Sequence, residues 1–385
     1  MTRPRLIGTV TAVRSTASAP ELIVLGPSLG TTAALWDDAA AELSGELRVL
    51  RFDLPGHGES PAAAAPFTIA ELADAVIDLV DSVGGGAFHY AGVSAGGAVG
   101  LELALRHPER LSTLTVICAA ARIGSAEGWA ERAQRVRESG TASLVSLSAE
   151  RWYAPGYLDA HPQAGGAELS RLVAVDDESY ALCCEALAVF DAREAVRGIR
   201  GATLIVAGEH DSATPPEQLE ALAAAIPDAA YVLLRGVAHL PARESPREVC
   251  ALIRSRLGGM RVRRAVLGDS HVDAATAATT AETADWQDFI TRFAWGGVWA
   301  RPGLGLRERS LLTFASLVTG GHEAELAMHL RAALRNGLSR AEIGEAIMHT
   351  ALYAGLPAAN SAFAVMVRVF AEPASTGPAS TEEGD

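Results

Sequence analysis

Short apolar runs, rich in β-branched residues, alternate with longer amphipathic segments along the first two thirds of the chain. The runs that predict strands are residues 22–25, 49–52, 88–93, 114–118, 204–207 and 231–234. Residues 68–83 instead repeat apolar positions at helical spacing, and Thr68 with Glu71 has the pattern of a capping box at the helix start. Alternation of this kind predicts a mostly parallel sheet with helices on both faces.

The alternation stops at about residue 121 and returns only after about residue 192. The intervening segments are polar with helical spacing, and they carry Trp129, Trp152 and Tyr153. An insertion late in a parallel sheet is suited to cover the edge at which the strands end. The pattern therefore predicts one α/β domain over residues 1–258, with a helical cap at about 121–192.

No strand pattern follows the α/β domain. An arginine-rich stretch at 259–267 predicts a linker, and residues 268–372 have helical spacing throughout. Ser339 and Glu342 form a second capping-box pattern. Helix-ending glycines and a helix-starting proline fall at Gly337, Gly355 and Pro357. Residues 373–385, rich in Pro, Ser and Thr, predict a disordered tail.

The length of 385 residues and the hydrophobic share of 49% allow two domains with sizeable cores. The net charge of −14 argues against nucleic acid or an anionic membrane as a partner, since either needs a basic surface. The four cysteines lack disulfide or metal-ligand spacing, and no stretch is apolar enough for a signal peptide or a membrane span. We expect a soluble, cytoplasmic protein.

The sequence Gly92-Val93-Ser94-Ala95-Gly96 follows a predicted strand and precedes a helical pattern. In this context the pentapeptide predicts a nucleophile elbow, a tight strand-to-helix turn that tolerates only small neighbours and exposes the serine hydroxyl. A serine hydroxyl becomes an effective nucleophile when a base takes its proton. Ser94 is therefore the candidate nucleophile.

Two residues that follow the last two predicted strands complete a candidate catalytic triad. Asp211 comes after the first of these strands and His239 after the second. Their order along the chain, serine then acid then histidine, is that of the nucleophile-elbow hydrolases. Asp211 is expected to orient the imidazole, and His239 to act first as base and then as acid. Other histidines are less suited, since His57 lies in a turn motif and no acid precedes His210 at the right place.

The negative oxygen formed by attack on an ester carbonyl needs two hydrogen-bond donors, usually backbone N–H groups. One is expected from Ala95, directly after the nucleophile, and the other from Leu29, in the loop after the first buried strand. With these donors the α/β domain has all the groups that ester hydrolysis requires.

The motifs SLGTTAALWD, RFDLPGHGES, AGVSAGG and GVAHLPARESP together resemble 3-oxoadipate enol-lactone hydrolases, over about residues 20–258. The resemblance implies the α/β-hydrolase fold and a five-membered enol lactone with an acetate side chain as substrate. Arg122, beside the cap, is the candidate for binding the acetate carboxylate, because a guanidinium binds a carboxylate bidentately. A surface position or a role at the cap hinge is the alternative for Arg122. Trp129 in the cap is a second candidate substrate contact.

The motifs FAWGGVWARPGL, RERSLLTFASL, HLRAALRNGLS and HTALYAGLPAAN resemble 4-carboxymuconolactone decarboxylases, over about residues 268–372. The resemblance implies an all-α domain and the reaction immediately before enol-lactone hydrolysis, in the β-ketoadipate pathway of protocatechuate catabolism. Loss of CO2 leaves a dienolate whose charge is carried by the lactone oxygen. The lactone itself is the electron sink, so neither a cofactor nor a metal is expected, and the expected partners are small lactone carboxylates.

Two histidines of the helical domain are candidates for the proton donor and the partner of the dienolate oxygen. Glu345, His349 and Tyr353 follow at a spacing of four on one helix face, and Glu325 with His329 repeats the pair on the preceding helix. A carboxylate one turn before a histidine can orient the ring and tune its pKa. We expect His349 to be the donor, because it lies near the helix end, with His329 as the alternative. Helix packing and metal ligation are the other interpretations of both pairs.

Arg301 and Arg309 are candidates for binding the substrate carboxylates, with a surface position as the alternative. Trp295 and Trp299, at a spacing of four, suit a core or a subunit interface better than catalysis. The related peroxidases use a Cys-x-x-Cys pair, and no cysteine follows Cys250. The helices have more apolar faces than one short bundle covers, so we expect a homo-oligomer formed through this domain. The competing hypothesis is another serine hydrolase, an esterase or a haloperoxidase-like enzyme, with a helical oligomerisation module.

Overall fold

The structure is a computed structural model of the 385-residue chain. It describes residues 3–13, 20–45, 47–227, 229–280, 282–301 and 303–371. The chain divides into two compact units, unit 1 with residues 1–256 and unit 2 with residues 257–385. The predicted tail at 373–385 lies outside the described residues.

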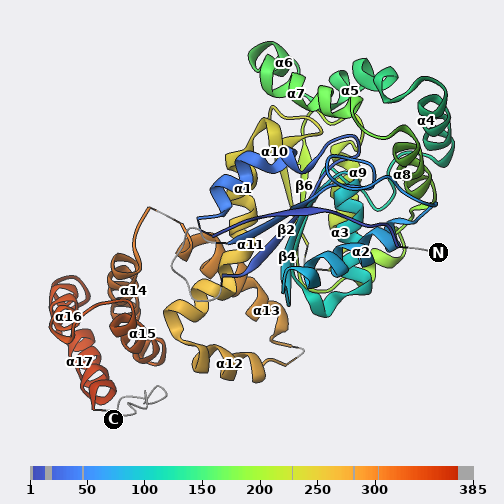
Figure 1. Cartoon of the computed structure of the whole chain (residues 1–385). Helices are drawn as coiled ribbons and strands as arrows, with labels where there is room; N and C mark the ends of the chain where they lie inside the picture. Colours follow the sequence, from blue (N-terminus) through green and yellow to red (C-terminus); the bar gives the residue numbers. More distant parts are fainter. Residues whose placement is uncertain are drawn as a thin grey trace, which may run out of the picture. The chain divides into compact units, whose positions relative to one another are not determined.

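Unit 1 is built on a seven-stranded sheet with the order β1-β3-β2-β4-β5-β6-β7. Figure 1 shows the sheet with β2, β4 and β6 labelled. Six parallel strands match the predicted runs: β2 (Leu22–Gly26), β3 (Arg48–Phe52), β4 (Phe88–Val93), β5 (Leu111–Ile117), β6 (Ala202–Gly208) and β7 (Ala230–Leu234). The edge strand β1 (Gly8–Thr11) pairs antiparallel with β3, and the sequence pattern does not predict it. Its four residues are not fully buried, so the apolar run that marks the central strands is missing there.

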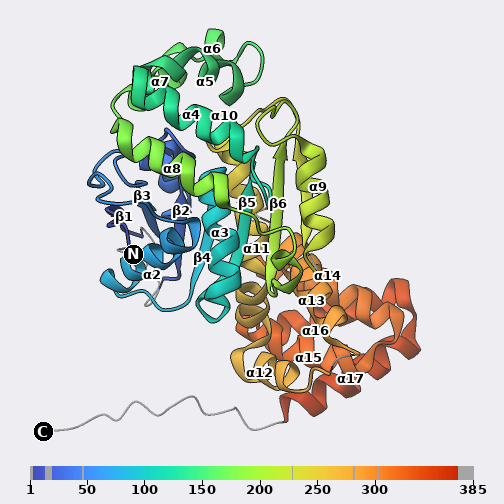
Figure 2. The same ribbon diagram turned by 90° about the vertical axis from the view of Figure 1, so that its right-hand side faces the viewer.

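Helices cover both faces of this sheet (Figure 2). They are α1 (Asp37–Leu43), α2 (Ile69–Ser82), α3 (Ala95–Arg106), α9 (Pro216–Ala225), α10 (Pro241–Glu244) and the first turns of α11 (Pro246–Leu267), with shorter turns at η1 (Ala33–Trp36), η2 (Pro108–Arg110) and η4 (Ala195–Gly198). The predicted capping box begins α2: the Glu71 N–H donates to the Thr68 hydroxyl at 3.2 Å, and the Thr68 N–H donates to the Glu71 carboxylate at 2.9 Å. The prediction of this helix is therefore confirmed, down to the residues that start it.

Five helices between β5 and β6 form a cap over the carboxyl ends of the parallel strands (Figure 2). They are α4 (Ala126–Ser139), α5 (Val145–Trp152), α6 (Tyr157–Ala160), α7 (Pro162–Val173) and α8 (Asp177–Val189), with a turn at η3 (Thr141–Leu144). The first and last of them, α4 and α8, pack along each other. The cap thus forms a layer of helices above the edge of the sheet at which Ser94 lies.

Residues 259–267, expected to be a linker, are helical and belong to α11. The prediction of a linker is wrong because these arginines belong to a helix whose apolar residues pack inward. Val266 lies in a core of unit 2, and Arg263 is also buried. Gly259 marks a close approach, since a Cβ there would lie 2.3 Å from the carbonyl oxygen of Thr291.

Unit 2 is helical over the described residues. Its elements after α11 are α12 (Asp269–Ala277), α13 (Ala284–Phe289), the π-helix η5 (Ile290–Trp299), α14 (Leu306–Gly320), α15 (Glu323–Arg335), α16 (Arg340–Ala354) and α17 (Leu356–Phe370). The second capping box is confirmed: the Ser339 N–H donates to the Glu342 carboxylate at 2.8 Å, and the Glu342 N–H donates to the Ser339 hydroxyl at 3.2 Å. Gly337 and Gly355 end helices with φ of 88° and 87°, which glycine adopts without strain.

Two apolar cores lie among the described residues of unit 2. One lies among α14, α15, α16 and α17 and includes Phe314, Leu330 and Ile347. The other joins α11, α12, η5 and α15 through Val266, Trp295 and their neighbours. No helix of the described residues is long and apolar enough to cross a lipid bilayer.

Candidate active sites

Ser94 occupies the turn between β4 and α3 with φ 55° and ψ −114°, a backbone conformation that is strained for a residue with a side chain. The neighbouring glycines make the turn possible. A Cβ on Gly92 would lie 2.3 Å from the carbonyl oxygen of Gly96, and a Cβ on Gly96 would lie 2.5 Å from that of Gly26. The turn therefore has the geometry of the nucleophile elbow that the pentapeptide predicts.

Asp211 and His239 are in contact beyond the ends of β6 and β7. The Nδ1–H of His239 donates to Oδ2 of Asp211 at 2.8 Å, and both residues are buried. The Thr214 hydroxyl donates to the same oxygen at 2.7 Å, and the N–H groups of Ala213 and Thr214 donate to Oδ1. Burial raises the pKa of Asp211, but His239 and these donors outweigh it and hold the pKa below its ordinary value. The ionised carboxylate thus fixes the orientation and tautomer of His239.

The N–H groups of Leu29 and Ala95 are the predicted oxyanion donors. Within the described residues neither N–H has a hydrogen-bond partner, whereas the Gly30 N–H, beside Leu29, donates to Nε2 of His57 at 3.1 Å. Burial lowers the pKa of His57 to about 4, so its ring stays neutral and accepts this bond. The turn that carries His57 therefore supports the loop of Leu29, a role that its sequence motif does not reveal.

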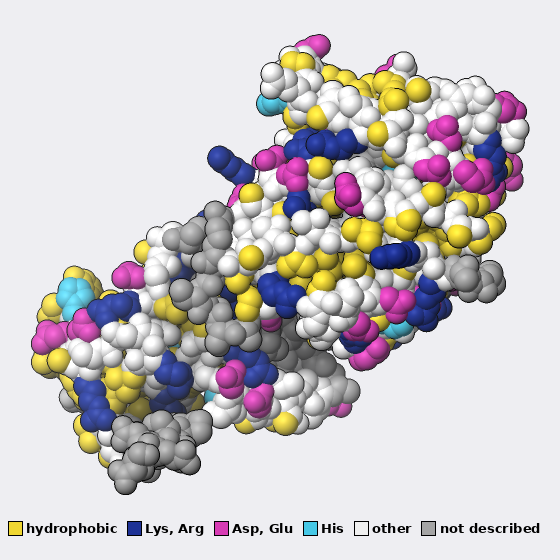
Figure 3. All heavy atoms as spheres, viewed as in Figure 1, with side chains coloured by type: hydrophobic (Ala, Val, Ile, Leu, Met, Phe, Trp, Pro, Cys, Tyr) yellow, Lys and Arg dark blue, Asp and Glu magenta, His cyan; other side chains and the backbone are white. Residues whose placement is uncertain are grey.

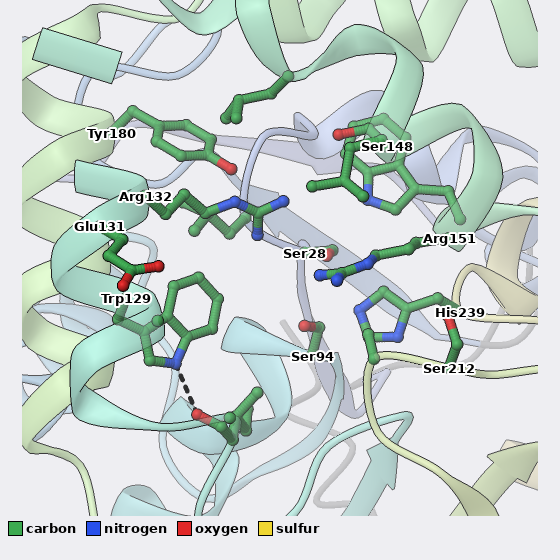
Figure 4. Close-up of a pocket in the computed structure, with 18 of the residues that line it drawn as sticks. Ser28, Ser94, Trp129, Glu131, Arg132, Ser148, Arg151, Tyr180, Ser212 and His239 are labelled. Carbon is green, nitrogen blue, oxygen red and sulfur yellow. Dashed lines mark hydrogen bonds between the residues drawn. The ribbon is translucent and has the colours of Figure 1, made fainter. Parts of the chain in front are cut away.

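A cavity of about 410 Å³ lies above Ser94 and His239 and is covered by the cap (Figure 4). The guanidinium groups of Arg132 on α4 and Arg151 on α5 reach into it from two sides, and Arg135 also lines it. Within the described residues neither Arg132 nor Arg151 has a carboxylate partner. Glu131 also lines the cavity, but the three arginines outnumber it, so the cavity has a net positive charge where the cap meets the candidate nucleophile.

The structure locates the two predicted substrate contacts of the cap differently. Nη1 of Arg122 lies 4.0 Å from Oδ2 of Asp191, at the base of the cap, and Arg122 is not among the residues that line the cavity. This position corresponds to the cap-hinge alternative. Trp129 does line the cavity, where its indole N–H donates to the Ile123 carbonyl at 2.6 Å and its ring lies 5.5 Å from the Arg132 guanidinium carbon (Figure 4).

Arg132, Arg151 and Glu244 were not among the sequence candidates. Arg132 and Arg151 lie in polar helices, where an arginine is ordinarily a surface charge, so only the fold distinguishes them. Glu244 lies in the motif GVAHLPARESP, which does not reveal its role: its carboxylate accepts from the Ala154 N–H of the cap at 2.7 Å and from the Ala238 N–H at 2.8 Å. Because Ala238 directly precedes the histidine of the candidate triad, Glu244 ties that loop to the cap.

Cys118 directly follows β5 and lies beside Asp211 and His239. It is fully buried, has φ 49°, and its thiol donates to the Ala238 carbonyl at 3.5 Å. Burial and then the charge of Asp211 raise the pKa of the thiol. One ligand atom from each of Cys118, Asp211 and His239 lies within 4.8 Å of the others, but the carboxylate oxygens already accept four hydrogen bonds. Cys118 is accordingly a neutral packing partner of the pair.

In unit 2, His329 of α15 lies beside Trp295 and Trp299 of η5, with ring centres 6.4 and 6.1 Å away and nearly parallel planes. The residue is 9% exposed. Burial and then the nearby His271 lower its pKa to about 4. Within the described residues no hydrogen bond joins His329 to Glu325, the carboxylate expected to orient it. The imidazole is a neutral ring held by aromatic packing.

The other candidate histidine, His349, lies at the surface of unit 2. Glu345 and His349 are exposed, and Tyr353 is 78% exposed. The rings of His349 and Tyr353 lie 5.5 Å apart, as their spacing predicts. Within the described residues His349 has no hydrogen bond to Glu345, so the three residues share one exposed face of α16 without forming a relay.

The predicted arginines and tryptophans of unit 2 have mainly structural contacts in a single chain. Arg309 donates to the carbonyl oxygens of Leu304 and Arg301 at 3.2 and 2.8 Å, and Arg301 is exposed. Trp295 is buried, and its ring lies 5.2 Å from that of Trp299. The tryptophans therefore form part of the core that contains His329.

Unit 2 also exposes large apolar side chains. The most exposed of them are Trp286, Phe289, Phe293 and Val298 from α13 and η5, Leu312 from α14, and Met348, Leu352, Tyr353, Leu356 and Val367 from α16 and α17. Figure 3 shows hydrophobic side chains at the surface of this unit, between arginines. Apolar patches bordered by charged groups are typical of surfaces that contact another protein.

The sheet order, the cap and the strained serine turn define unit 1 as an α/β hydrolase. The chain belongs to the alpha/beta hydrolase family, whose model matches residues 23–252, and in its second part to the carboxymuconolactone decarboxylase family, whose model matches residues 284–368. Both resemblances noted in the sequence are confirmed by these matches.

Individual relatives support the same division. The first part is similar to 3-oxoadipate enol-lactonase 2 from Acinetobacter baylyi, with 35% identity over 192 residues, 50% of this chain and 72% of that protein. The second part is similar to 4-carboxymuconolactone decarboxylase from the same organism, with 49% identity over 112 residues, 29% of this chain and 84% of that protein. The enol-lactonase structure from Burkholderia xenovorans LB400 matches with a TM-score of 0.63 and 35% identity, over 66% of this chain and 96% of that one.

A further relative of the first part has a different stated activity. The putative carbamate hydrolase RutD from Pseudomonas savastanoi pv. phaseolicola is 33% identical over 237 residues, 58% of this chain and 88% of that protein. The chain is thus an enzyme that joins a hydrolase unit and a decarboxylase-family unit in one polypeptide, and the choice of substrate depends on the side chains of each site.

Proposed function

We propose that this chain is a bifunctional enzyme that decarboxylates 4-carboxymuconolactone to 3-oxoadipate enol-lactone and hydrolyses that lactone to 3-oxoadipate. The observation that carries the proposal is the pairing of the two families. Removing the carboxyl group from the ring of a carboxymuconolactone gives an enol lactone, so the product of unit 2 is the substrate of unit 1.

In unit 1 the proposed nucleophile is Ser94. Its oxygen attacks the lactone carbonyl while His239 takes the proton, and the N–H groups of Leu29 and Ala95 stabilise the oxyanion. Collapse of this intermediate breaks the ring C–O bond and leaves an acyl group on Ser94. The enolate oxygen departs with the proton from His239, and the enol becomes a ketone. A water activated by His239 then releases the acyl group as the second carboxylate of 3-oxoadipate.

Arg132 and Arg151 are the proposed binding residues for substrate carboxylates, in place of Arg122. Each guanidinium offers paired N–H donors that match the two oxygens of a carboxylate. The enol lactone has one carboxylate and 3-oxoadipate has two, so two cations above Ser94 suit the product as well as the substrate. Trp129 supplies an apolar wall beside them.

In unit 2 the proposed reaction breaks the bond between the γ-carbon and its carboxyl group. The electron pair spreads through the ring to the lactone oxygen, and a proton added to the α-carbon completes the enol lactone. His329 is the better candidate to stabilise this oxygen, because a buried neutral imidazole donates an N–H bond that water does not weaken. His349, with Glu345 and Tyr353, is the alternative if a second copy of the chain covers α16.

Unit 2 is also the proposed site of homo-oligomerisation. The exposed apolar residues of α13, η5, α16 and α17 form the surface for it, because burying them removes apolar area from water. Sedimentation of the intact chain, compared with a Leu352→Glu variant, tests this assignment: the variant should sediment as a smaller species.

The proposed function is tested by supplying 4-carboxymuconolactone to the purified chain and following both CO2 and 3-oxoadipate by NMR. The account predicts stoichiometric formation of both. A second candidate for unit 1 is hydrolysis of a different ester or amide, which the similarity to the putative carbamate hydrolase favours. CO2 release with accumulation of an enol lactone that the intact chain never hydrolyses would support that candidate instead.

A further inference from the structure

Arg263 on α11 is a buried cation whose partners are all neutral. It is 5% exposed, and its guanidinium donates to the Thr291 hydroxyl at 2.9 Å and to the Gln287 side-chain oxygen at 2.8 Å. Its buried Nε has no hydrogen-bond partner, and no carboxylate pairs with it within the described residues. Burying a guanidinium costs free energy unless an anion compensates it. The fold therefore keeps a charge here that nothing in the described chain neutralises.

Further cations surround this position. Burial and then the charges of Arg263, Arg335 and Arg331 lower the pKa of His271 on α12. Arg335 reaches from α15 to the carboxyl end of α11, where it donates to the Val266 carbonyl at 3.3 Å. Arg335 also lies 3.3 Å from the position of a Cβ on Gly268, the residue before α12, so a second cation stands at the start of the helix that carries the exposed His271 and would attract an anion there.

The same core also contains His329. Its ring lies beside those of Trp295 and Trp299, and Trp295 belongs to the same apolar core as Val272, the residue after His271. Glu325 is the acidic group whose charge reaches His329, and it is exposed. The core that joins α11, α12, η5 and α15 therefore brings together the buried Arg263 and His329 and the exposed His271.

We propose that Arg263, His271 and His329 form a binding site for a small dicarboxylate, in which Arg263 pairs with the carboxylate that the substrate retains. The proposal rests on the proposed decarboxylase function of unit 2 and deepens it. A carboxylate that leaves as CO2 loses its charge in the transition state, so a cation bound to it would stabilise the ground state and slow the reaction. The carboxymethyl group keeps its charge throughout and is the suitable anchor.

Arg264, the next residue of α11, is a matched control. Its guanidinium pairs with Asp269 at 3.1 Å and with Asp273 at 2.7 Å. Arg263→Gln and Arg264→Gln each remove one positive charge from the same turn of the same helix. Only Arg263→Gln removes a cation that lacks an acidic partner. A difference in substrate or inhibitor binding between the two variants is therefore due to the proposed site and not to the change in net charge.

The probe is citramalate, which carries an oxygen, a carboxylate and a carboxymethyl group on one carbon, as the γ-carbon of the lactone does. Two measurements use the intact chain: inhibition of CO2 release, and hydrogen exchange of the peptides that cover α11 and α12. Citramalate should inhibit competitively and protect these peptides in the wild type. Arg263→Gln should raise the KM for CO2 release and the inhibition constant by about 10- to 100-fold, with a smaller change in kcat, and Arg264→Gln should change neither.

A structural role for Arg263 predicts different results. In that case Arg263→Gln lowers the melting temperature and kcat, leaves the KM unchanged, and the proposal is overturned. If Arg263 binds substrate and is not needed for folding, the melting temperature of Arg263→Gln without ligand should equal or exceed that of the wild type, because an unpaired buried charge has been removed. If Arg263→Gln does not fold, the same measurements are made on Arg263→Lys and on the wild type. Absence of citramalate protection of α11 and α12 in the wild type then overturns the proposal. An absence of CO2 release with protection intact would instead refute only the proposed reaction.

Discussion

Acidification should destabilise unit 2 through His329. The pKa of this buried ring is lowered to about 4 in the folded unit, from an ordinary 6.5. The unfolded chain therefore binds the proton more readily, so the stabilisation is complete above pH 6.5 and is lost as the pH falls from there to 4. From these two pKa values, the loss at pH 5 relative to pH 8 is about 2 kcal/mol.

The perturbation that isolates this effect is His329→Asn, which keeps a polar side chain but removes the titrating group. Urea unfolding at pH 8 and pH 5, followed by pulsed hydrogen exchange on peptides of α15, measures unit 2 separately in the intact chain. The variant should be less stable than the wild type at pH 8, because packing against Trp295 and Trp299 is lost. Its stability should nevertheless fall by about 2 kcal/mol less than that of the wild type between the two pH values.

His349→Asn is the matched control, because that histidine is exposed on the neighbouring helix and its replacement should leave the wild-type pH dependence intact. An identical loss of stability between pH 8 and pH 5 in the wild type and in His329→Asn would refute the reasoning. It would mean that His329 is not buried as a neutral ring in the folded unit.

Other predictions concern the hydrolase unit and the metal dependence. Arg151→Gln should raise the KM for the enol lactone, measured by steady-state kinetics, by about 10- to 100-fold, as expected for a lost charged hydrogen bond. Arg137→Gln should leave this KM unchanged, because Arg137 lies outside the cavity and pairs with Glu178 and Glu185. Glu244→Gln should lower the hydrolase kcat by about tenfold and leave CO2 release unchanged. A hydrolase kcat equal to that of the wild type would show that the two hydrogen bonds of Glu244 do not position the loop of His239. EDTA should change neither reaction, and a loss restored by Zn2+ or Mn2+ would contradict the proposed mechanisms.

Features set by neighbouring residues could be predicted from the sequence. The six parallel strands, the Ser94 turn and both capping boxes depend on local spacing and on small neighbours, and the structure has them where the sequence indicates. The Asp211–His239 contact was predictable because parallel strands end at one edge of the sheet, which brings residues that follow different strands together.

Features set by packing could not be predicted in this way. Arg122 and Arg132 have the same side chain and lie close in sequence. Only Arg132, on α4, lines the cavity above Ser94, whereas Arg122 lies beside Asp191. The arginine-rich stretch 259–267 looks like a polar linker until the burial of Arg263 is known. His329 and His349 have the same spacing to a carboxylate, and only the tertiary contacts with tryptophan distinguish them.

The claim that two separate sites act in sequence is tested most directly by Ser94→Ala supplied with 4-carboxymuconolactone. The account predicts CO2 release at the wild-type rate and stoichiometric accumulation of the enol lactone, because the decarboxylase site in unit 2 does not use Ser94. NMR follows the lactone, and a folded wild-type-like melting curve excludes unfolding as the cause. Loss of both CO2 release and hydrolysis in the folded variant would contradict the account, since it would mean that the two reactions share one site.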